Sequence, residues 1–504
     1  MALIPITYPA GIVTNGTEYA NSGRWIDGNL VRFQNGFLRP FGGWELIKTT
    51  ALQGTPIGIF AYRDNEGARV LAIGTREKIY VNYIDQWYDI TPVGYQSDAG
   101  ASPLGYGAYE YGMESYGDAR SQSGLAFDTK SFAFTNFGEI LVFCSASDGK
   151  IYKWQPNSAT NNPDTIATVL HPNAPINNIG VIVSNERHVI ALGSGGDPRK
   201  IAWSSREDFT TWTASSTNTA GDLNVPTGGR ILGAKKWQTD IVIFTDTGIN
   251  RMYYAGSPFI YGIQTAGDNC KTLAIRSVVS TGNSLYWMGE NSFFTFNGQV
   301  SEIPCDVHDF VFDNLNHTYR QTSCGGYNSN YNEVIWFFPT GDSVVPNKYV
   351  IYNTREKTWS VGSLDRSCWL DAGSLDYPVA CDSSGFVYQH ESKLLFNSPG
   401  LATNVPFVVG SPFEIGNGTQ VAQINQLIPD EESQNIPALT LSMKGKFTPN
   451  GQETDFGSFT FDSNTGYTDC RISSRQLSLT VTGATNQDFK LGKVRANVKS
   501  RGKR

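Results

Sequence analysis

Short runs of apolar, β-branched and aromatic residues recur along most of the chain and are separated by turn residues. Residues 57–90 hold four such runs, with a turn at Asn65-Glu66-Gly67, and this pattern predicts four successive strands. The four-run unit recurs loosely at residues 132–154, 179–212, 231–263, 273–303, 324–361 and, more weakly, 377–390.

Repeats of about 40 to 50 residues, each a small sheet that cannot bury both faces alone, are typical of a β-propeller. We therefore expect an all-β fold, with a propeller of roughly six or seven blades. The alternative is an array of separate β-sandwiches, although sandwiches usually have longer Greek-key connections.

Three segments fall outside the repeat. Residues 1–50 are expected to form an extended N-terminal arm with one hairpin at Asn35-Gly36. Residues 94–120 alternate Tyr with Gly and are expected to form a long loop inserted into the propeller, which would span residues 51–400. Residues 401–504 contain further strand-like runs and are expected to form a small C-terminal β-domain with a basic tail. One short helix is expected over residues 307–314.

The distribution of charge changes this picture. The formal net charge is −7, yet the last twelve residues contain six Lys or Arg and no acid, so the remainder carries −13. This distribution predicts a tail that contacts an anionic neighbour and a body that holds nucleic acid only weakly. No uncharged apolar run approaches the roughly 20 residues of a membrane span, and residues 1–11 lack the basic start of a secretory signal. Assembly in a cytoplasm is therefore expected.

Candidate catalytic chemistry is sparse. One possible set of four zinc ligands is Cys305, His308, His317 and Cys324. However, their spacing matches no zinc finger, and the residues between them suit a packed helical turn. The seven cysteines are irregularly spaced and are expected to be free thiols. No phosphate-binding loop, nucleophile elbow or metalloprotease motif is present, so we expect no enzyme, no catalytic or metal-binding residues, no cofactor and no small-molecule substrate.

The residues expected to act are assembly residues. The arm is too irregular to fold alone, and its aromatic side chains need a surface to cover; that surface belongs to a neighbouring subunit or to the same chain. The tyrosines of the inserted loop are expected to contact another subunit, because exposed tyrosines at this density are otherwise unfavourable. The candidate residues are Arg24, Trp25, Arg32, Phe33, Arg39 and Trp44 in the arm, Tyr106, Tyr109, Tyr111 and Tyr116 in the loop, and Lys499, Arg501, Lys503 and Arg504 in the tail.

Several motifs, in order along the chain, resemble a family of short-tailed phage proteins described as tail nozzle or packaged-DNA stabilisation proteins, similar in role to tail tubular protein B. These motifs are Arg24-Trp25, residues 29–33, LRPFGGW at 38–44, the Tyr/Gly loop at 105–117, WSxxxDFxxW at 203–212, the helical insert at 306–314, residues 474–479, Leu491-Gly492 and the basic terminus. The resemblance implies a β-propeller subunit of a sixfold ring, mounted below the portal and adaptor, that forms the DNA exit channel of a virion tail.

We therefore expect a structural protein that forms a homo-oligomeric ring, a hexamer, with an acidic lumen that passes double-stranded DNA with only transient contact. Its other partners would be the portal-adaptor ring and tail fibres or spikes. Two other functions remain open. A propeller glycosidase or depolymerase would have paired carboxylates in a cleft, and a receptor-binding propeller would bind glycan as an isolated subunit.

Overall fold

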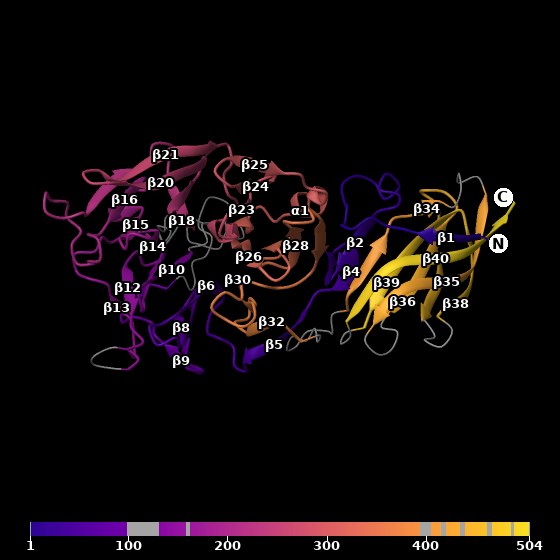
Figure 1. Cartoon of the computed structure of the whole chain (residues 1–504), viewed down its shortest axis with the longest axis horizontal. Helices are drawn as coiled ribbons and strands as arrows, with labels where there is room; N and C mark the ends of the chain where they lie inside the picture. The colour runs from indigo at the N-terminus through magenta and orange to yellow at the C-terminus, as the bar shows by residue number, and fades with distance from the viewer. Residues whose placement is uncertain are drawn as a thin grey trace, which may run out of the picture.

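Seven four-stranded antiparallel sheets are arranged around a common centre in the computed structural model, and each sheet is one blade of a β-propeller (Figure 1). The structure describes residues 2–97, 131–157, 162–393, 405–414, 420–433, 439–460, 466–484 and 488–502. The all-β propeller predicted from the four-run repeats is confirmed, and within the described residues there are seven blades.

The first four blades follow one another along the chain. Blade 1 contains β6 (Pro56–Arg63), β7 (Arg69–Thr75), β8 (Ile79–Tyr83) and β9 (Gln86–Asp89). Blade 2 contains β10 (Phe132–Phe137), β11 (Ile140–Ser145), β12 (Ile151–Trp154) and β13 (Thr168–Val169). Blade 3 contains β14 (Gly180–Val183), β15 (Val189–Leu192), β16 (Lys200–Trp203) and β17 (Gly221–Asn224). Blade 4 contains β18 (Ile231–Trp237), β19 (Asp240–Thr245), β20 (Gly248–Gly256) and β21 (Ile260–Asp268).

The last three blades complete the ring. Blade 5 contains β22 (Val279–Ser280), β23 (Leu285–Met288), β24 (Phe293–Phe296) and β25 (Val300–Ile303). Blade 6 contains β26 (Cys324–Asn328), β27 (Glu333–Phe338), β28 (Lys348–Asn353) and β29 (Trp359–Gly362). Blade 7 contains β30 (Cys368–Leu370), β31 (Val379–Cys381), β32 (Val387–Lys393) and, from the N-terminal arm, β5 (Gly43–Lys48).

The first strand of each blade contacts the first strands of its two neighbours, so these seven innermost strands surround the centre of the propeller. The ring closes where β30 meets β6, and β5 fixes this closure because it crosses from the start of the chain to the outer edge of blade 7. The last repeat looked weak at residues 377–390 because its outer strand lies more than 300 residues earlier in the sequence.

Burial explains why the middle strands are mostly apolar rather than alternating. All six residues of β19 and of β27 are buried, because both faces of each blade pack against a neighbouring blade. A cluster of buried apolar side chains fills each interface; between blades 1 and 2, for example, Val70 and Val81 share a cluster with Leu141 and Phe143. At about 1.5–3 kcal/mol for each buried aliphatic or aromatic side chain, these interfaces are the main stabilising contribution to the ring.

The rest of the arm pairs with the C-terminal strands to form two six-stranded sheets that pack face to face (Figure 1). The first sheet contains β1 (Ala2–Ile6), β3 (Val31–Gln34), β4 (Phe37–Pro40), β35 (Val421–Ser433), β38 (Thr468–Ser474) and β40 (Phe489–Arg501). The second contains β2 (Trp25–Asn29), β33 (Phe407–Gly410), β34 (Phe413–Glu414), β36 (Leu439–Lys446), β37 (Thr454–Thr460) and β39 (Gln476–Gly483). The expected hairpin at Asn35-Gly36 joins β3 to β4, and both turn residues have positive φ (52° and 78°), as a two-residue turn of this type requires. This unit is called the sandwich below.

Helices are few and short among the described residues. The expected helix is α1 (His308–Phe312), and three 3-10 turns accompany it: η1 (Ser194–Gly196), η2 (Ile275–Ser277) and η3 (Arg320–Thr322). None of the helices in the described part of the chain is long and apolar enough to cross a membrane. The fourth strands of blades 2, 3 and 7 lie outside the expected repeats: β13 follows residue 154, β17 follows residue 212, and β5 precedes residue 51. In blade 3, residues 204–220 form a loop between β16 and β17 instead of a strand ending at Trp212.

Candidate functional site

A row of cationic side chains lies on the exposed face of β40, and we call it the cationic stripe: Lys493, Arg495, Lys499 and Arg501. Side chains alternate between the two faces of a strand, so the intervening Val494, Ala496 and Val498 are buried in the sandwich core. Eight residue steps at about 3.3 Å each make the stripe roughly 26 Å long. β40 pairs with β35 along its length and with β1 from Val494 to Val498, so the stripe lies on a central strand whose last residues, Lys499 to Arg501, are paired on one side.

The cationic stripe has no internal counter-charge. No ion pair links any of its four side chains to an acid among the described residues; the nearest ion pair on this strand joins Lys490 Nζ to Glu432 at 3.3 Å. The cross-strand neighbours of Arg495 are Pro5 and Ile428, and the neighbour of Lys499 on β35 is Gln423. The stripe therefore presents four solvated positive charges on an acidic protein.

The tail residues predicted from sequence divide accordingly. Lys499 and Arg501 belong to the stripe, whereas Lys503 and Arg504 lie outside the described residues. Sequence reasoning placed the basic residues in a tail and did not anticipate a central strand. The alternation of Val494, Ala496 and Val498 with charged residues is the signal that could have revealed it.

The arm residues lie mostly inside the protein. Trp25 and Phe33 are buried in the sandwich core, and Trp44 is buried between blades 6 and 7. These aromatic side chains cover the chain's own core rather than a neighbouring subunit. Arg24 and Arg39 are half-buried, and Arg39 donates a 3.4 Å hydrogen bond to Gln34. The four loop tyrosines, Tyr106, Tyr109, Tyr111 and Tyr116, lie outside the described residues.

Arg32 is the centre of a buried ionic cluster that joins the sandwich to the propeller. Its guanidinium contacts Glu391 of β32, with Nη1 donating at 3.2 Å, and its Nη2 lies 3.0 Å from Glu333 Oε2 of β27 without hydrogen-bond alignment. All three side chains are at most 5% exposed, and the guanidinium stacks on Tyr331 with its carbon 3.6 Å from the ring centroid. One cation thus faces two buried carboxylates.

This imbalance shifts the protonation of the cluster. Burial raises the pKa of Glu333 to about 7, and the attraction of Arg32 only partly opposes that shift. Burial also acts to lower the pKa of Arg32, but the two carboxylates outweigh it and raise the pKa further above its ordinary value. The sequence singled out Arg32 as a contact to another subunit; in the structure its partners belong to the same chain.

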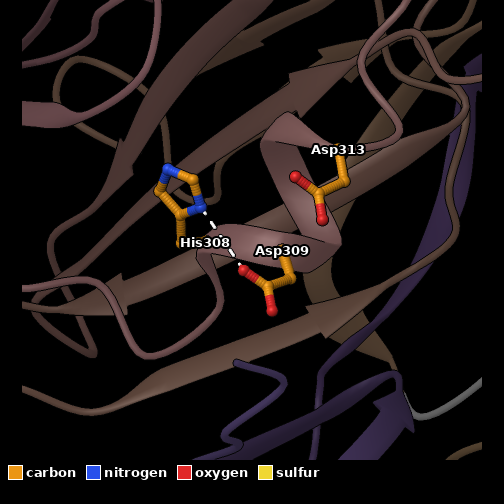
Figure 2. Close-up of side chains that lie close together, drawn as sticks. All are labelled: His308, Asp309 and Asp313. Atoms are coloured by element: carbon orange, nitrogen blue, oxygen red, sulfur yellow. Dashed lines mark ion pairs between the residues drawn. The ribbon is translucent and has the colours of Figure 1, made fainter. Parts of the chain in front are cut away.

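A group of potential metal ligands lies on α1 (Figure 2). The ligand atoms of His308, Asp309 and Asp313 lie within 4.8 Å of one another, and His308 Nδ1 is 3.5 Å from Asp309 Oδ1. The second Asp309 oxygen accepts a 2.9 Å hydrogen bond from the Gly16 amide, which accounts for its position. The zinc set written from sequence does not assemble among the described residues: Cys324 is buried in another cluster and donates to the Arg366 carbonyl oxygen.

A buried polar network that the sequence did not reveal lies between blades 3 and 4. Tyr261 Oη donates to Ser184 Oγ at 2.7 Å and lies 2.9 Å from His188 Nδ1. Burial lowers the pKa of His188, which favours the neutral ring. The His188 amide also donates to Ser184 Oγ, so the serine hydroxyl closes the β14–β15 turn and the network is structural.

Comparisons with known proteins assign no function to the chain. No family model matches the chain, and no curated protein matches it significantly. Similar solved structures include the WD40 domain of Pan2 from Neurospora crassa, at 9% identity and a TM-score of 0.39, covering 72% of this chain and 97% of that one. Another is YCF48 from Cyanidioschyzon merolae, at 9% identity and a TM-score of 0.35, covering 69% and 98%.

Proposed function

We propose that this protein is a structural, non-enzymatic subunit of the tail nozzle of a short-tailed phage, where a ring of copies forms the DNA exit channel. The proposal starts from the sequence resemblance in the arm, the loop and the C-terminal segment. The observation that carries it is the cationic stripe: four charges of a central strand have no ion-pair partner among the described residues and are suited to docking against an anionic surface.

The partner proposed for the stripe is the adjoining adaptor ring rather than DNA. Outside its last twelve residues the chain carries −13, and a surface of that sign repels a polyanion. Solvated charges at the rim of an interface mainly set orientation and association rate, which suits the ordered stacking of one ring on another. Weak contact with DNA would in turn allow the genome to pass.

Charge reversal of the stripe tests this function. Phage particles lacking this protein would be mixed with purified wild-type chain or with the double variant Lys499→Glu/Arg501→Glu, and docking would be followed against salt concentration. We expect the variant to fold and to dock about tenfold more slowly at low salt, with a flatter salt dependence. The matched control, Arg355→Glu/Lys357→Glu, reverses two exposed cations of a propeller turn that have no ion pair among the described residues, and it should dock like wild type. Equal docking by both double variants would contradict the assigned role of the stripe.

DNA binding provides a second test. We expect the purified protein to bind double-stranded DNA only weakly at physiological salt, because its charged surface outside the stripe is acidic. Salt-resistant retention on a DNA column would contradict an exit channel that passes DNA freely.

A further inference from the structure

A cavity of about 300 Å³ lies at the centre of the propeller. Its walls come from the innermost strands of blades 1 to 4, which are β6, β10, β14 and β18, and from η2 at the start of blade 5. These strands surround the middle of the ring in Figure 1. The volume is at the lower end of the range for small-molecule pockets, about 300–1,000 Å³.

Charge is segregated in this cavity. Three of its lining residues are cationic, Lys235 and Lys236 of β18 and Arg276 of η2, and none is acidic. None of the seven innermost strands of the described propeller contains an Asp or Glu. In a chain with a net charge of −7, it is not explained by composition that all the charged residues described around this cavity are cationic.

Lys235 has no partner for its charge among the described residues. No hydrogen bond or ion pair joins its ammonium group to any described residue, and its burial lowers its pKa. The side chain is half-buried, so its charge is partly removed from water without being paired, which is unfavourable for the fold. Arg276, in contrast, is oriented: its Nη2 donates to the Ser367 carbonyl oxygen, and the rest of its guanidinium has no bond to the described part of the chain. An anion in the cavity would satisfy both groups.

Another part of the cavity wall is aromatic. Phe60, Phe132 and Phe134 line the cavity, and the last two rings are stacked with centroids 5.3 Å apart at 9°. Gly58 and Gly74 leave room for them, since a Cβ atom at either position would lie 2.6 Å from the Phe132 side chain. Stacked rings present an apolar surface that suits a planar group.

We propose that the centre of the propeller binds a small organic anion, with its carboxylate or phosphate group held by Lys235 and Arg276 and its planar apolar part against Phe132 and Phe134. The anion is a bound ligand rather than a substrate, and its site is independent of the cationic stripe and of the nozzle function.

The test is calorimetric titration of the full chain with 1-naphthoate and 1-naphthyl phosphate, which distinguish the two anionic groups, and with neutral 1-naphthamide. We expect at least one anion to bind at least about tenfold more tightly than the amide, and to lose about tenfold in affinity in Lys235→Met. The control Lys200→Met removes a lysine that pairs with Asp222 elsewhere in the propeller and should bind like wild type. No saturable binding of either anion up to about 1 mM, or equal binding of anion and amide, would overturn the proposal.

The melting temperature of Lys235→Met distinguishes a lysine that binds a ligand from a lysine that stabilises the fold. If Lys235 serves a ligand, Lys235→Met removes an unpaired charge and the melting temperature of the free protein stays the same or rises. A melting temperature lowered by the substitution, together with unchanged anion affinity, would assign Lys235 to the fold and refute the site.

Discussion

Replacing Arg32 by Met should lower the free energy of unfolding by about 3–5 kcal/mol, the cost of leaving a buried charge without its partner. Methionine retains the apolar stem of arginine but removes the cation that lies between Glu333 and Glu391. The lost contact with the Tyr331 ring adds up to about 2 kcal/mol. Uptake of a proton by Glu333, whose pKa is already about 7, offsets part of the loss, so the lower half of the range is expected near neutral pH.

Urea unfolding followed by tryptophan fluorescence would measure this effect. The matched control is Arg39→Met, because Arg39 lies opposite Arg32 in the β3–β4 hairpin but is half-buried with one long hydrogen bond. The control should change stability by less than about 1 kcal/mol. Adding Glu333→Gln and Glu391→Gln to Arg32→Met should recover most of the loss. Equal losses in Arg32→Met and Arg39→Met would refute the view that this cluster joins the sandwich to the propeller.

Three further predictions follow from burial. Because the pKa of Glu333 is raised from 4.5 to about 7, the folded state keeps a proton that the unfolded chain releases, so the free energy of unfolding falls by roughly 3 kcal/mol between about pH 4.5 and 7. Glu333→Gln should flatten the pH dependence of the melting temperature across that window, and an unchanged pH dependence would contradict the assignment. The pKa of Lys235 is lowered, so its unfavourable contribution to stability diminishes and the melting temperature rises as the pH rises toward the ordinary lysine pKa. Lys235→Met should remove this rise, and a rise that persists in the variant would argue against the role of Lys235. Trp44→Ala on β5 should lower the free energy of unfolding in urea by about 3–5 kcal/mol and expose blade 7 to proteolysis. The control Ile47→Ala, at a side chain of the same strand that is 38% exposed, should lower it by about 0.5 kcal/mol or less. Similar losses in the two variants would mean that β5 does not close the ring.

Local patterns were sufficient to predict the blades. Residues 57–90 show why: the four runs and their turns are contiguous, and the observed strands β6 to β9 follow them closely. Tight turns and apolar runs are encoded within a few residues, so the propeller could be predicted from the sequence alone.

Pairings between distant segments were not accessible in this way. The position of β5 in blade 7 and of β40 at the centre of a sheet depends on tertiary contacts that no local pattern encodes. The ionic cluster has the same origin, since Arg32 and Glu391 are 359 residues apart. Lys235 and Lys236 did leave a local signal, because two lysines interrupt an otherwise apolar strand, but only the ring geometry places them around a cavity.

The most direct test of the proposed function is electron cryo-microscopy of the purified protein and of the virion that contains it. The account predicts a closed ring of identical subunits at the tail, coaxial with the portal and with a central opening wide enough for duplex DNA. A monomer at high concentration, combined with density for this chain only on peripheral fibres or nowhere in the virion, would contradict it.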